Sequence, residues 1–273
     1  MTTFLFWNIN RKPLENLIRL LVDAHAPHII MLAECRVPTA DLLIALNKNG
    51  AYTYHLLRDR LSIQGPSRLV LVSRLPRSHV RPVAGIPEVA IYKVKPLEGD
   101  ELLLVAMHLP SKLYYDTTAQ ALLATRLPSL IAAAERSAKH QRTVVMGDLN
   151  MDPFEAGVTS SETLHAVMDR QVALREARQV QGQRRSLFYN PMWSRLGDGT
   201  SGPPGTYYIA PSGPLTNYWY TLDQVLIRPD LLANFRDENL TVLTQAGQTN
   251  LLSLAGIPNT SVASDHLPLL FKI

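Results

Sequence analysis

Short apolar runs alternate with amphipathic stretches near the N-terminus. Residues 4–10 form an apolar run that ends in polar positions and predicts a strand, and residues 13–27 carry apolar side chains at helical spacing after a proline suited to a first turn. The same order follows once more, with a predicted buried strand at 28–34 and a predicted helix at 39–50, which runs from a Thr39 N-cap to a glycine stop. The chain therefore begins with two strand–helix units.

The middle of the chain changes to apolar runs that no helix separates. Proline and glycine turns join these runs, which predicts antiparallel neighbours rather than strand–helix–strand units. The predicted strands cover residues 52–57, 68–74, 89–96 and 101–110. A predicted helix at 117–140, a strand at 142–150 and two closing strands at 219–229 and 264–273 complete the order. This mixture predicts an α/β fold in which two packed, mixed and mainly antiparallel β-sheets are flanked by helices.

Polar side chains with catalytic or ligand chemistry gather at the ends of the predicted strands. They are Asn8, Glu34, His108, Asp148 and Asn150 at strand ends, Asp223 inside the strand 219–229, and Asp265 and His266 at the opening of the last strand. Strand ends that are far apart in sequence can meet on one rim of a sandwich. Carboxylate and amide oxygens suit a hard cation such as Mg²⁺ or Mn²⁺, and no pattern of cysteine and histidine supports zinc.

Taken singly, most of these residues also fit structural positions. The asparagines and the pair Asp265–His266 are typical of turns, and His108 fits a core position equally well. Glu34 and Asp223 are harder to explain in this way, because an ionised carboxylate within an apolar strand needs a partner. Asp152 is assigned to the turn before the next proline rather than to a site.

Six short motifs follow one another along the chain: WNIN, LAEC, VAMHLPS, MGDLNMDP, LDQVLI and SDHLP. Any one of them arises by chance, but all six in this order, each at a strand edge, form a specific pattern. From residue 4 to residue 271 the chain resembles the endonuclease/exonuclease/phosphatase superfamily, which includes pancreatic-type deoxyribonucleases, abasic-site endonucleases, deadenylases, sphingomyelinases and inositol-polyphosphate 5-phosphatases. The resemblance implies a four-layer α/β sandwich that hydrolyses phosphate esters with a divalent metal ion, Mg²⁺ or Mn²⁺.

The resemblance also implies which residues hold the metal ion. Glu34 corresponds to a metal-binding glutamate, Asn8 beside it holds a metal-bound water or the substrate, and Asp265 is a further ligand. His108 corresponds to a position with histidine in pancreatic-type deoxyribonucleases and tyrosine in abasic-site endonucleases, which disfavours base-excision repair. By this resemblance, His108 would protonate the leaving oxygen or bind the phosphate.

The remaining catalytic roles follow from the same resemblance. Asp148 corresponds to an aspartate that accepts a proton from the attacking water or orients it, and Asn150 to an amide that fixes this water and a phosphate oxygen. His266 would stabilise the charge that develops on the phosphoryl group, while Asp223 holds its ring and favours the protonated form. Gly147 is expected to leave space for the substrate. Gln224 stands where many nucleases carry tyrosine or histidine, and we expect it near the scissile phosphate.

Composition and charge narrow the picture further. A chain of 273 residues with 46% apolar content and no low-complexity tract is expected to form one domain over 1–273. A net charge of +4 gives a weak preference for an anionic partner. Cys35 is the single cysteine, so no intramolecular disulfide is expected and a cytoplasmic location fits best. The N-terminal sequence shows no signal peptide or membrane span, which predicts a soluble protein without membrane contact.

The segment at about 181–219 is rich in glycine, proline and aromatic residues and is predicted to be a long loop. Its candidate substrate-binding residues are Arg184, Arg185, Tyr189, Trp193 and Arg195. Aromatic residues among arginines suit the bases and phosphates of a nucleic acid, although a long ordered loop also needs aromatic anchors of its own. A second candidate phosphate-contacting edge, or simply a solvated surface, consists of Arg58, Arg60 and Arg68.

The sequence thus predicts a divalent-metal-dependent nuclease that acts on DNA, with RNA as a second choice and nucleic acid as its partner. No protein partner is indicated. One alternative is a phosphatase or phosphodiesterase for a small phosphorylated metabolite or a lipid head group, which the long loop would close over. Another is a module that keeps the fold for binding only, which the presence of Glu34, Asp148 and His266 disfavours.

Overall fold

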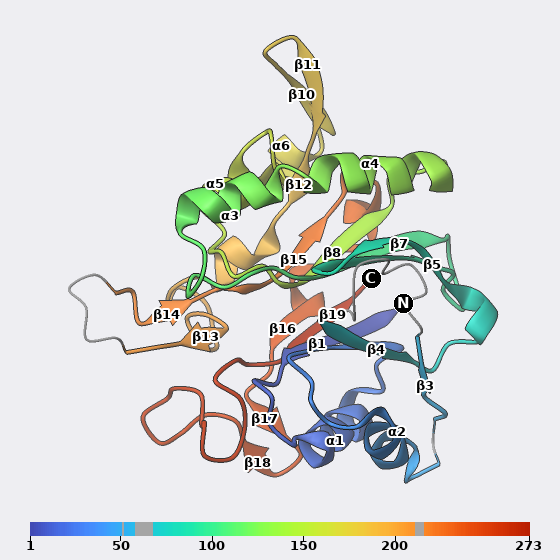
Figure 1. The fold of residues 1–273 in the computed structure, drawn as a ribbon, viewed down its shortest axis with the longest axis vertical. Helices are drawn as coiled ribbons and strands as arrows, with labels where there is room; N and C mark the ends of the chain where they lie inside the picture. The colour runs from blue at the N-terminus through green and yellow to red at the C-terminus, as the bar shows by residue number, and fades with distance from the viewer. Residues whose placement is uncertain (51, 58–67, 211–215) are drawn as a thin grey trace.

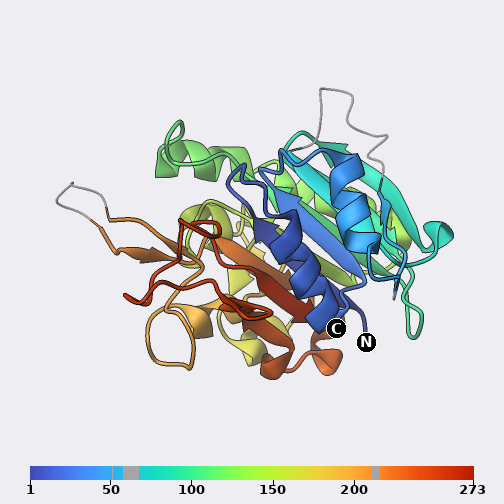
Figure 2. The ribbon, with the colours of Figure 1, turned by 90° about the horizontal axis from the view of Figure 1, so that it is seen from below.

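Two large β-sheets face each other, and helices cover their outer faces (Figures 1 and 2). The structure is a computed structural model that describes residues 1–50, 52–57, 68–210 and 216–273; Arg58 and Arg60 lie outside these residues. The four layers are helices, sheet, sheet and helices, as Figure 1 shows from bottom to top. The predicted α/β sandwich is confirmed.

The first sheet contains the two strands that open the chain and the strand that closes it. Its strands are β1 (Thr3–Asn8), β2 (Ile29–Ala33), β3 (His55–Leu56), β4 (Leu69–Ser73), β16 (Leu240–Val242) and β19 (Leu269–Lys272). Their order is β16-β19-β1-β2-β4-β3. Strands β1 and β2 run parallel and are connected by α1 (Glu15–His25), while α2 (Thr39–Asn47) follows β2. Both helices lie on the outer face of this sheet (Figure 1).

The second sheet is built around another parallel pair. Its strands are β5 (Val80–Ile86), β6 (Val89–Val94), β7 (Leu102–His108), β8 (Thr143–Asp148), β9 (Ala166–Val167), β12 (Phe188–Tyr189) and β15 (Asp223–Ile227). Their order is β5-β6-β7-β8-β15-β12-β9. The parallel strands β7 and β8 are connected by α3 (Thr117–Ala124) and α4 (Leu127–Ala138), which cover the outer face (Figure 1).

The remaining helices and strands are short and do not belong to the two large sheets. They are α5 (Ala156–Thr159), α6 (Arg170–Ala173), the paired strands β10 (Ala177–Val180) and β11 (Gln183–Ser186), β13 (Tyr207–Tyr208) and β14 (Trp219–Tyr220), β17 (Gln245–Ala246) and β18 (Thr249–Asn250), and the 3₁₀ helices η1 (Arg77–His79), η2 (Pro191–Arg195), η3 (Pro229–Asn234) and η4 (Asp237–Asn239). Within the described ranges, no helix has the length and apolar character needed to cross a membrane.

Apolar side chains fill both faces of each sheet, which explains the unbroken apolar runs in the sequence. In β1, Phe4 and Phe6 belong to the core between the sheets, whereas Leu5 and Trp7 pack with the residues of α1 and α2. Strand β7 alternates in the same way between the central core and the cluster beneath α4. A strand buried on both faces shows no alternation of polar and apolar residues, so its sequence does not reveal which side chains face which layer.

Several predicted element boundaries were wrong. The helix predicted at 117–140 is two helices, and α4 begins at Leu127 with Pro128 in its first turn, where the missing N–H of proline costs nothing. Thr39 is the first residue of α2 rather than its N-cap. Strand β5 was not predicted because Pro82 interrupts its apolar pattern; β5 is an edge strand, where proline is tolerated.

The predicted long loop and the last two strands also differ from the structure. The segment 181–219 contains β11, the short strands β12 and β13, and η2, so short regular elements interrupt the described part of the predicted loop. The strand predicted at 219–229 is interrupted after β14, and Asp223 is the first residue of β15. The last strand begins at Leu269, which places Asp265 and His266 in the loop before it.

A half-buried histidine directly before β2 makes the stability of the protein depend on pH. The backbone N–H of Thr3 donates to Nδ1 of His28 at 3.0 Å, and Nη2 of Arg74 lies 3.0 Å from Nε2. Burial, followed by the charge of Arg74, lowers the pKa of His28 from 6.5 to about 4. The unfolded chain therefore binds a proton that the folded chain does not, and the stability from this site is complete above the unfolded pKa and decreases as the pH falls towards the folded one.

We expect the urea midpoint to fall between about pH 7.5 and about pH 4.5, and to fall less in His28→Gln, because glutamine does not titrate. The measurement is urea unfolding of both proteins at the two pH values, so that the titration of other groups cancels. Equal falls in the two proteins would contradict a role of His28.

Candidate active site

The strand pairing brings the ends of five segments to one rim of the sandwich. In the parallel pair β1 and β2, Asn8 is level with Ala33, the residue before Glu34. In the parallel pair β7 and β8, His108 is level with Asp148. Strand β15 runs antiparallel to β8, so its first residue, Asp223, pairs with the last residue of β8. Because parallel strands end on the same side of a sheet, the two sheets place all these side chains at one edge.

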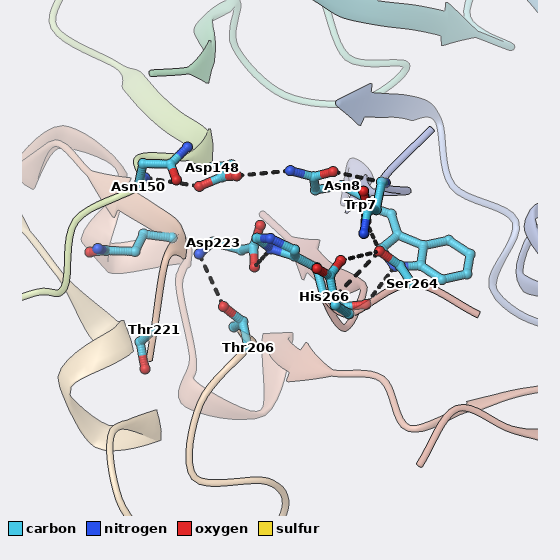
Figure 3. A network of polar contacts seen from close by, with 12 residues as sticks. Trp7, Asn8, Asp148, Asn150, Thr206, Thr221, Asp223, Ser264 and His266 are labelled. Atoms are coloured by element: carbon cyan, nitrogen blue, oxygen red, sulfur yellow. Dashed lines mark hydrogen bonds and ion pairs between the residues drawn. The ribbon is translucent and has the colours of Figure 1, made fainter. Parts of the chain in front are cut away.

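Asp148 occupies the centre of this rim and joins the two sheets. Its side chain is 1% exposed, and Oδ2 accepts a hydrogen bond from Nδ2 of Asn8 at 2.9 Å across the gap between the sheets. Its Oδ1 accepts from the backbone N–H of Asn150 at 2.8 Å (Figure 3). Burial, followed by the negative charge of Asp223, raises the pKa of Asp148. The buried carboxylate is therefore held in one orientation by two donors.

Asn150 turns the chain back towards Asp148. It has a positive φ of 53°, a conformation that asparagine adopts more readily than most residues. Its side-chain Nδ2 donates to the carbonyl oxygen of Leu109, directly after β7, at 2.8 Å. Asn150 thus links the loops that follow β7 and β8 and keeps a second amide hydrogen and Oδ1 for other partners.

His266 and Asp223 form a buried pair beside Asp148. Nδ1 of His266 lies 2.8 Å from Oδ2 of Asp223, which is 0% exposed. Burial alone would lower the pKa of His266, but the charge and hydrogen bond of Asp223, with the charges of Asp148 and Asp265, raise it to about 10. The imidazole therefore carries a positive charge at neutral pH, and its second nitrogen, Nε2, is free of the Asp223 contact.

Backbone contacts fix the loop that carries His266. The indole Nε1 of Trp7 donates to the carbonyl oxygen of His266 at 2.9 Å, and the hydroxyl of Ser264 donates to the carbonyl oxygen of Asn8 at 2.7 Å (Figure 3). The ring of Tyr207 packs against that of His266, with the two ring centroids 4.6 Å apart. The histidine is thus held by the end of β1 and by β13.

Sequence reasoning did not assign these supporting residues to the site. Trp7 and Ser264 are direct neighbours of site residues within the WNIN and SDHLP motifs, and this adjacency was the available signal. Thr206, whose Oγ1 accepts from the backbone N–H of Asp223 at 3.0 Å, and Tyr207 come from a distant segment. Only the fold brings that segment to the rim.

Glu34, which is partly exposed, and the buried His108 lie next to each other at the rim. Nε2 of His108 lies 3.9 Å from Oε1 of Glu34 and 3.9 Å from Oδ2 of Asp148. Oε2 of Glu34 pairs with Nε of Arg11 at 3.0 Å, a contact that sequence reasoning missed. Glu34 and Arg11 have positive φ values of 49° and 61°. Such strained backbone persists only where its surroundings enforce it and is frequent at functional sites.

The oxygen-rich rim fits a hard divalent cation. Ligand atoms of Asp148, Asp223 and His266 lie within 4.8 Å of one another. In addition, Oδ1 of Asp223 is buried and has no hydrogen-bond partner, which is costly unless a ligand satisfies it. The predicted ligands Glu34 and Asn8 border this group without belonging to it.

Asp265 lies half-buried at the same edge. Its Oδ1 lies 3.2 Å from Oγ of Ser264. Its charge contributes to the raised pKa of His266. Asp265 therefore adds a third acidic residue on the His266 side of the rim.

The predicted arginines of the segment 181–219 have other partners. Arg184 pairs with Glu176 at 3.7 Å across the β10–β11 hairpin, and Arg185 pairs with Glu162. Figure 1 shows this hairpin projecting beyond the helical layer. Arg195 donates to two backbone carbonyls of the η4 and β16 region. No hydrogen bond or ion pair joins these arginines to the rim in the part of the chain that the structure describes.

The predicted aromatic residues are likewise used for packing. Tyr189 pairs with Ile227, four residues along β15 from Asp223, which corresponds to roughly 13 Å at about 3.3 Å per residue. Trp193 packs against Phe154 with ring centroids 6.3 Å apart. Long ordered segments need apolar anchors, and these two residues provide them.

Gly147 and Gln224 have structural roles that differ from those expected from the sequence, whereas Asp152 has the expected role. A Cβ on Gly147 would lie 1.9 Å from the carbonyl oxygen of Met107, so the glycine allows β7 and β8 to approach and does not make room for substrate. Gln224 is fully buried, and its side chain donates to the carbonyl oxygen of Met151. Asp152 accepts from the backbone N–H of Thr221 at 2.8 Å and shapes the turn, as its sequence context indicates.

The fold and the rim together define a class of protein: a four-layer α/β sandwich with a buried carboxylate and histidine site at one edge. The model of the Endonuclease/Exonuclease/phosphatase family matches residues 5–266, and the chain belongs to this family. Members of this superfamily are phosphoric ester hydrolases. No curated protein sequence matches the chain significantly.

Several solved structures share this fold. An endonuclease/exonuclease/phosphatase family protein from Leptotrichia buccalis aligns over 100% of this chain and 99% of its own with a TM-score of 0.59 and 11% identity. TDP2 from D. rerio, complexed with a single-strand DNA product, covers 99% and 97% with a TM-score of 0.53 and 13% identity. The 3′ phosphatase NExo from Neisseria, bound to a product DNA hairpin, covers 100% and 99% with a TM-score of 0.53 and 15% identity. At these identities the likeness shows the fold.

Proposed function

We propose that the protein is a divalent-metal-dependent phosphodiesterase that hydrolyses phosphodiester bonds of nucleic acid, with DNA ahead of RNA. The observation that carries the proposal is the buried group of Asp148, Asp223 and His266, whose ligand atoms lie within 4.8 Å of one another at a rim lined by further polar side chains. Burying two carboxylates together is costly, and such groups are concentrated at catalytic sites. The proposed location is the cytoplasm.

The charges at the rim fit the needs of phosphodiester hydrolysis. A phosphodiester is anionic and repels a nucleophile. Its negative charge must therefore be offset while a water molecule is aligned opposite the leaving group. A bound Mg²⁺ or Mn²⁺ would supply Lewis-acid stabilisation of the phosphate oxygens. Glu34, Asn8 and Asp265 are the residues proposed to hold this ion, and the unsatisfied Oδ1 of Asp223 is a further oxygen available at the rim.

Each catalytic residue has one proposed task. Asp148, fixed by two hydrogen bonds, orients the attacking water and accepts its proton, and Asn150 helps to position it. His266 stabilises negative charge on the phosphoryl oxygens from Nε2, because Nδ1 is occupied by Asp223. His108, 3.9 Å from both Glu34 and Asp148, faces the leaving-group side or a phosphate oxygen.

Two relatives in fold favour nucleic acid over a small ester. The TDP2 structure contains a single-strand DNA product and the NExo structure a product DNA hairpin. The net charge of +4 agrees with an anionic substrate. The arginines and aromatic residues of the segment 181–219 do not contribute to the proposal, since their contacts are elsewhere.

The test is cleavage of supercoiled plasmid, linear duplex, single-stranded DNA and RNA by the purified protein with Mg²⁺ or Mn²⁺. We expect cleavage with either ion and none in EDTA, with Asp148→Asn as the inactive control. If the protein cleaves none of these polymers but releases phosphate from small esters, the result would favour a phosphatase over a nuclease. Activity that persists in EDTA and in Asp148→Asn would contradict the proposal as a whole.

A further inference from the structure

A pocket with its own set of side chains adjoins the rim on the side of Glu34 and His108. Its volume is about 380 Å³, and its lining includes three arginines and two tyrosines besides these two residues. The lining side chains that matter here are Arg11, Arg36, Arg68, Tyr114 and Tyr115. The volume lies within the range of roughly 300 to 1,000 Å³ that is usual for pockets of small ligands. The pocket is continuous with the proposed catalytic rim because Glu34 and His108 belong to both.

The tyrosines belong to a turn whose apolar tip is exposed. Leu113 is 87% exposed, Tyr114 84% and Tyr115 39%, although each is a large apolar or aromatic side chain. They lie between β7, which ends at His108, and α3. Neighbouring exposed apolar residues of this kind mark interaction sites more often than isolated ones do.

The base of this turn is firmly attached to the protein. Lys112 forms an ion pair with Glu155, and the side chain of Asp116 accepts from the N–H of Ala119 to cap α3 at 2.8 Å. On the other side, Gln120 donates to the carbonyl oxygen of Pro110 at 2.9 Å. The turn is therefore anchored at both ends, while its aromatic tip remains uncovered. An aromatic side chain held in place before binding loses less entropy when a ligand stacks on it.

The arginines give the pocket an excess of positive charge. Three arginines face one glutamate, and only Arg11 is paired with it, at 3.0 Å. Neither Arg36 nor Arg68 makes a side-chain hydrogen bond or ion pair with another residue in the described ranges. Unpaired guanidinium groups beside a catalytic rim are suited to a phosphate that lies next to the one being cleaved.

We propose that this pocket binds an unpaired nucleotide next to the scissile phosphate, with its base on Tyr114 and Tyr115 and its neighbouring phosphate at Arg36 and Arg68. The inference rests on the proposed function and specifies its substrate as single-stranded nucleic acid or an unpaired strand end. A tyrosine ring can stack only on a base whose face is open, and within a duplex both faces are covered by neighbouring pairs. Arginines with aromatic residues are the usual means of holding a single strand.

The test compares four variants for binding and for cleavage. The double variant Tyr114→Ala/Tyr115→Ala removes the rings, and Tyr114→Phe/Tyr115→Phe keeps them. Arg36→Ala removes one free cation, and Arg184→Ala is its control on the distant β10–β11 hairpin. Binding of a fluorescein-labelled DNA single strand is followed by anisotropy in EDTA, where metal-dependent cleavage does not occur. Cleavage is followed with the same strand in the presence of Mg²⁺.

We expect the alanine double variant and Arg36→Ala to weaken single-strand binding about tenfold, whereas the phenylalanine double variant and Arg184→Ala bind like the wild type. Cleavage of the strand should fall together with binding in the alanine double variant and in Arg36→Ala, and should stay unchanged in Arg184→Ala. No binding of the strand by the wild type, unchanged binding in the alanine variants, or an equal loss in Arg184→Ala would overturn the inference. In each of these cases, metal-dependent cleavage by the wild type would leave the proposed function intact. If the strand binds in a tyrosine-dependent way but is not cleaved, the result would contradict the proposed function and support the nucleotide-binding pocket.

Discussion

Replacing His266 by asparagine is expected to lower kcat for phosphodiester hydrolysis by about 10²- to 10³-fold, the usual effect of removing a group that stabilises transition-state charge. Nδ1 of His266 is bound to Asp223 at 2.8 Å, so only the other ring nitrogen is available to a phosphate. The amide nitrogen of asparagine can replace Nδ1 as the donor to Asp223, but no atom replaces Nε2. The substitution therefore removes the reacting group while it leaves the buried carboxylate with a partner.

The measurement is the steady-state rate with the preferred polymer and Mg²⁺, together with thermal unfolding to show that the fold is kept. His28→Gln is the matched control, because His28 is a histidine at the start of β2 that contacts Thr3 and Arg74 rather than the rim. Its activity at neutral pH should equal that of the wild type. A folded His266→Asn protein with full activity would refute the role of His266 in the proposed mechanism.

Replacing Arg228 by methionine is expected to destabilise the protein by about 3 to 5 kcal/mol, the usual result of leaving one member of a buried ion pair alone. Nε of Arg228 lies 2.8 Å from Oε1 of Glu135, and the two side chains are 6% and 4% exposed. Arg228 also donates to the carbonyl oxygen of Leu187 at 3.0 Å, and Thr143 donates to Glu135 at 2.9 Å. The pair thus ties α4 to the strands beneath it.

Urea unfolding at neutral pH of Arg228→Met, Glu135→Leu and the double variant measures this effect. We expect each single variant to lose several times more stability than the double variant, because the double variant leaves no unpaired charge in the core. Additive losses in the double variant would show that the two residues stabilise the fold independently. A loss below about 1 kcal/mol in Arg228→Met would contradict the prediction, since that is the value typical of exposed ion pairs.

The residues of the rim could be predicted from the sequence because their positions follow a local rule. Asn8, His108 and Asp148 each end an apolar strand, and strand ends are set by short-range sequence patterns. The loop 181–219 could not be interpreted in the same way. Arginine and aromatic residues have the same composition whether they bind a ligand or anchor a segment, and Tyr189 and Arg185 turned out to be engaged in packing and in an ion pair.

The sequence also did not reveal the residues of the pocket beside Glu34. Tyr114 and Tyr115 follow β7 in a stretch without a motif, and Arg36 is one arginine among many in a basic chain. Their significance depends on exposure and on the absence of partners in the described structure, which are properties of the folded surface. Arg11 gained its role only when the end of β1 came to lie beside Glu34.

Local sequence patterns were sufficient to predict the α/β class and the polar residues at the strand ends, because apolar periodicity and strand boundaries are local properties of the chain. The tertiary structure alone decided that Asp148 would meet Asn8 across two sheets and that Asp223 would pair with His266, since these contacts join residues 140 and 43 positions apart. It also decided which arginines are paired and which are free. Those outcomes depend on sheet order and on the burial of charge, and no local pattern encodes either of them.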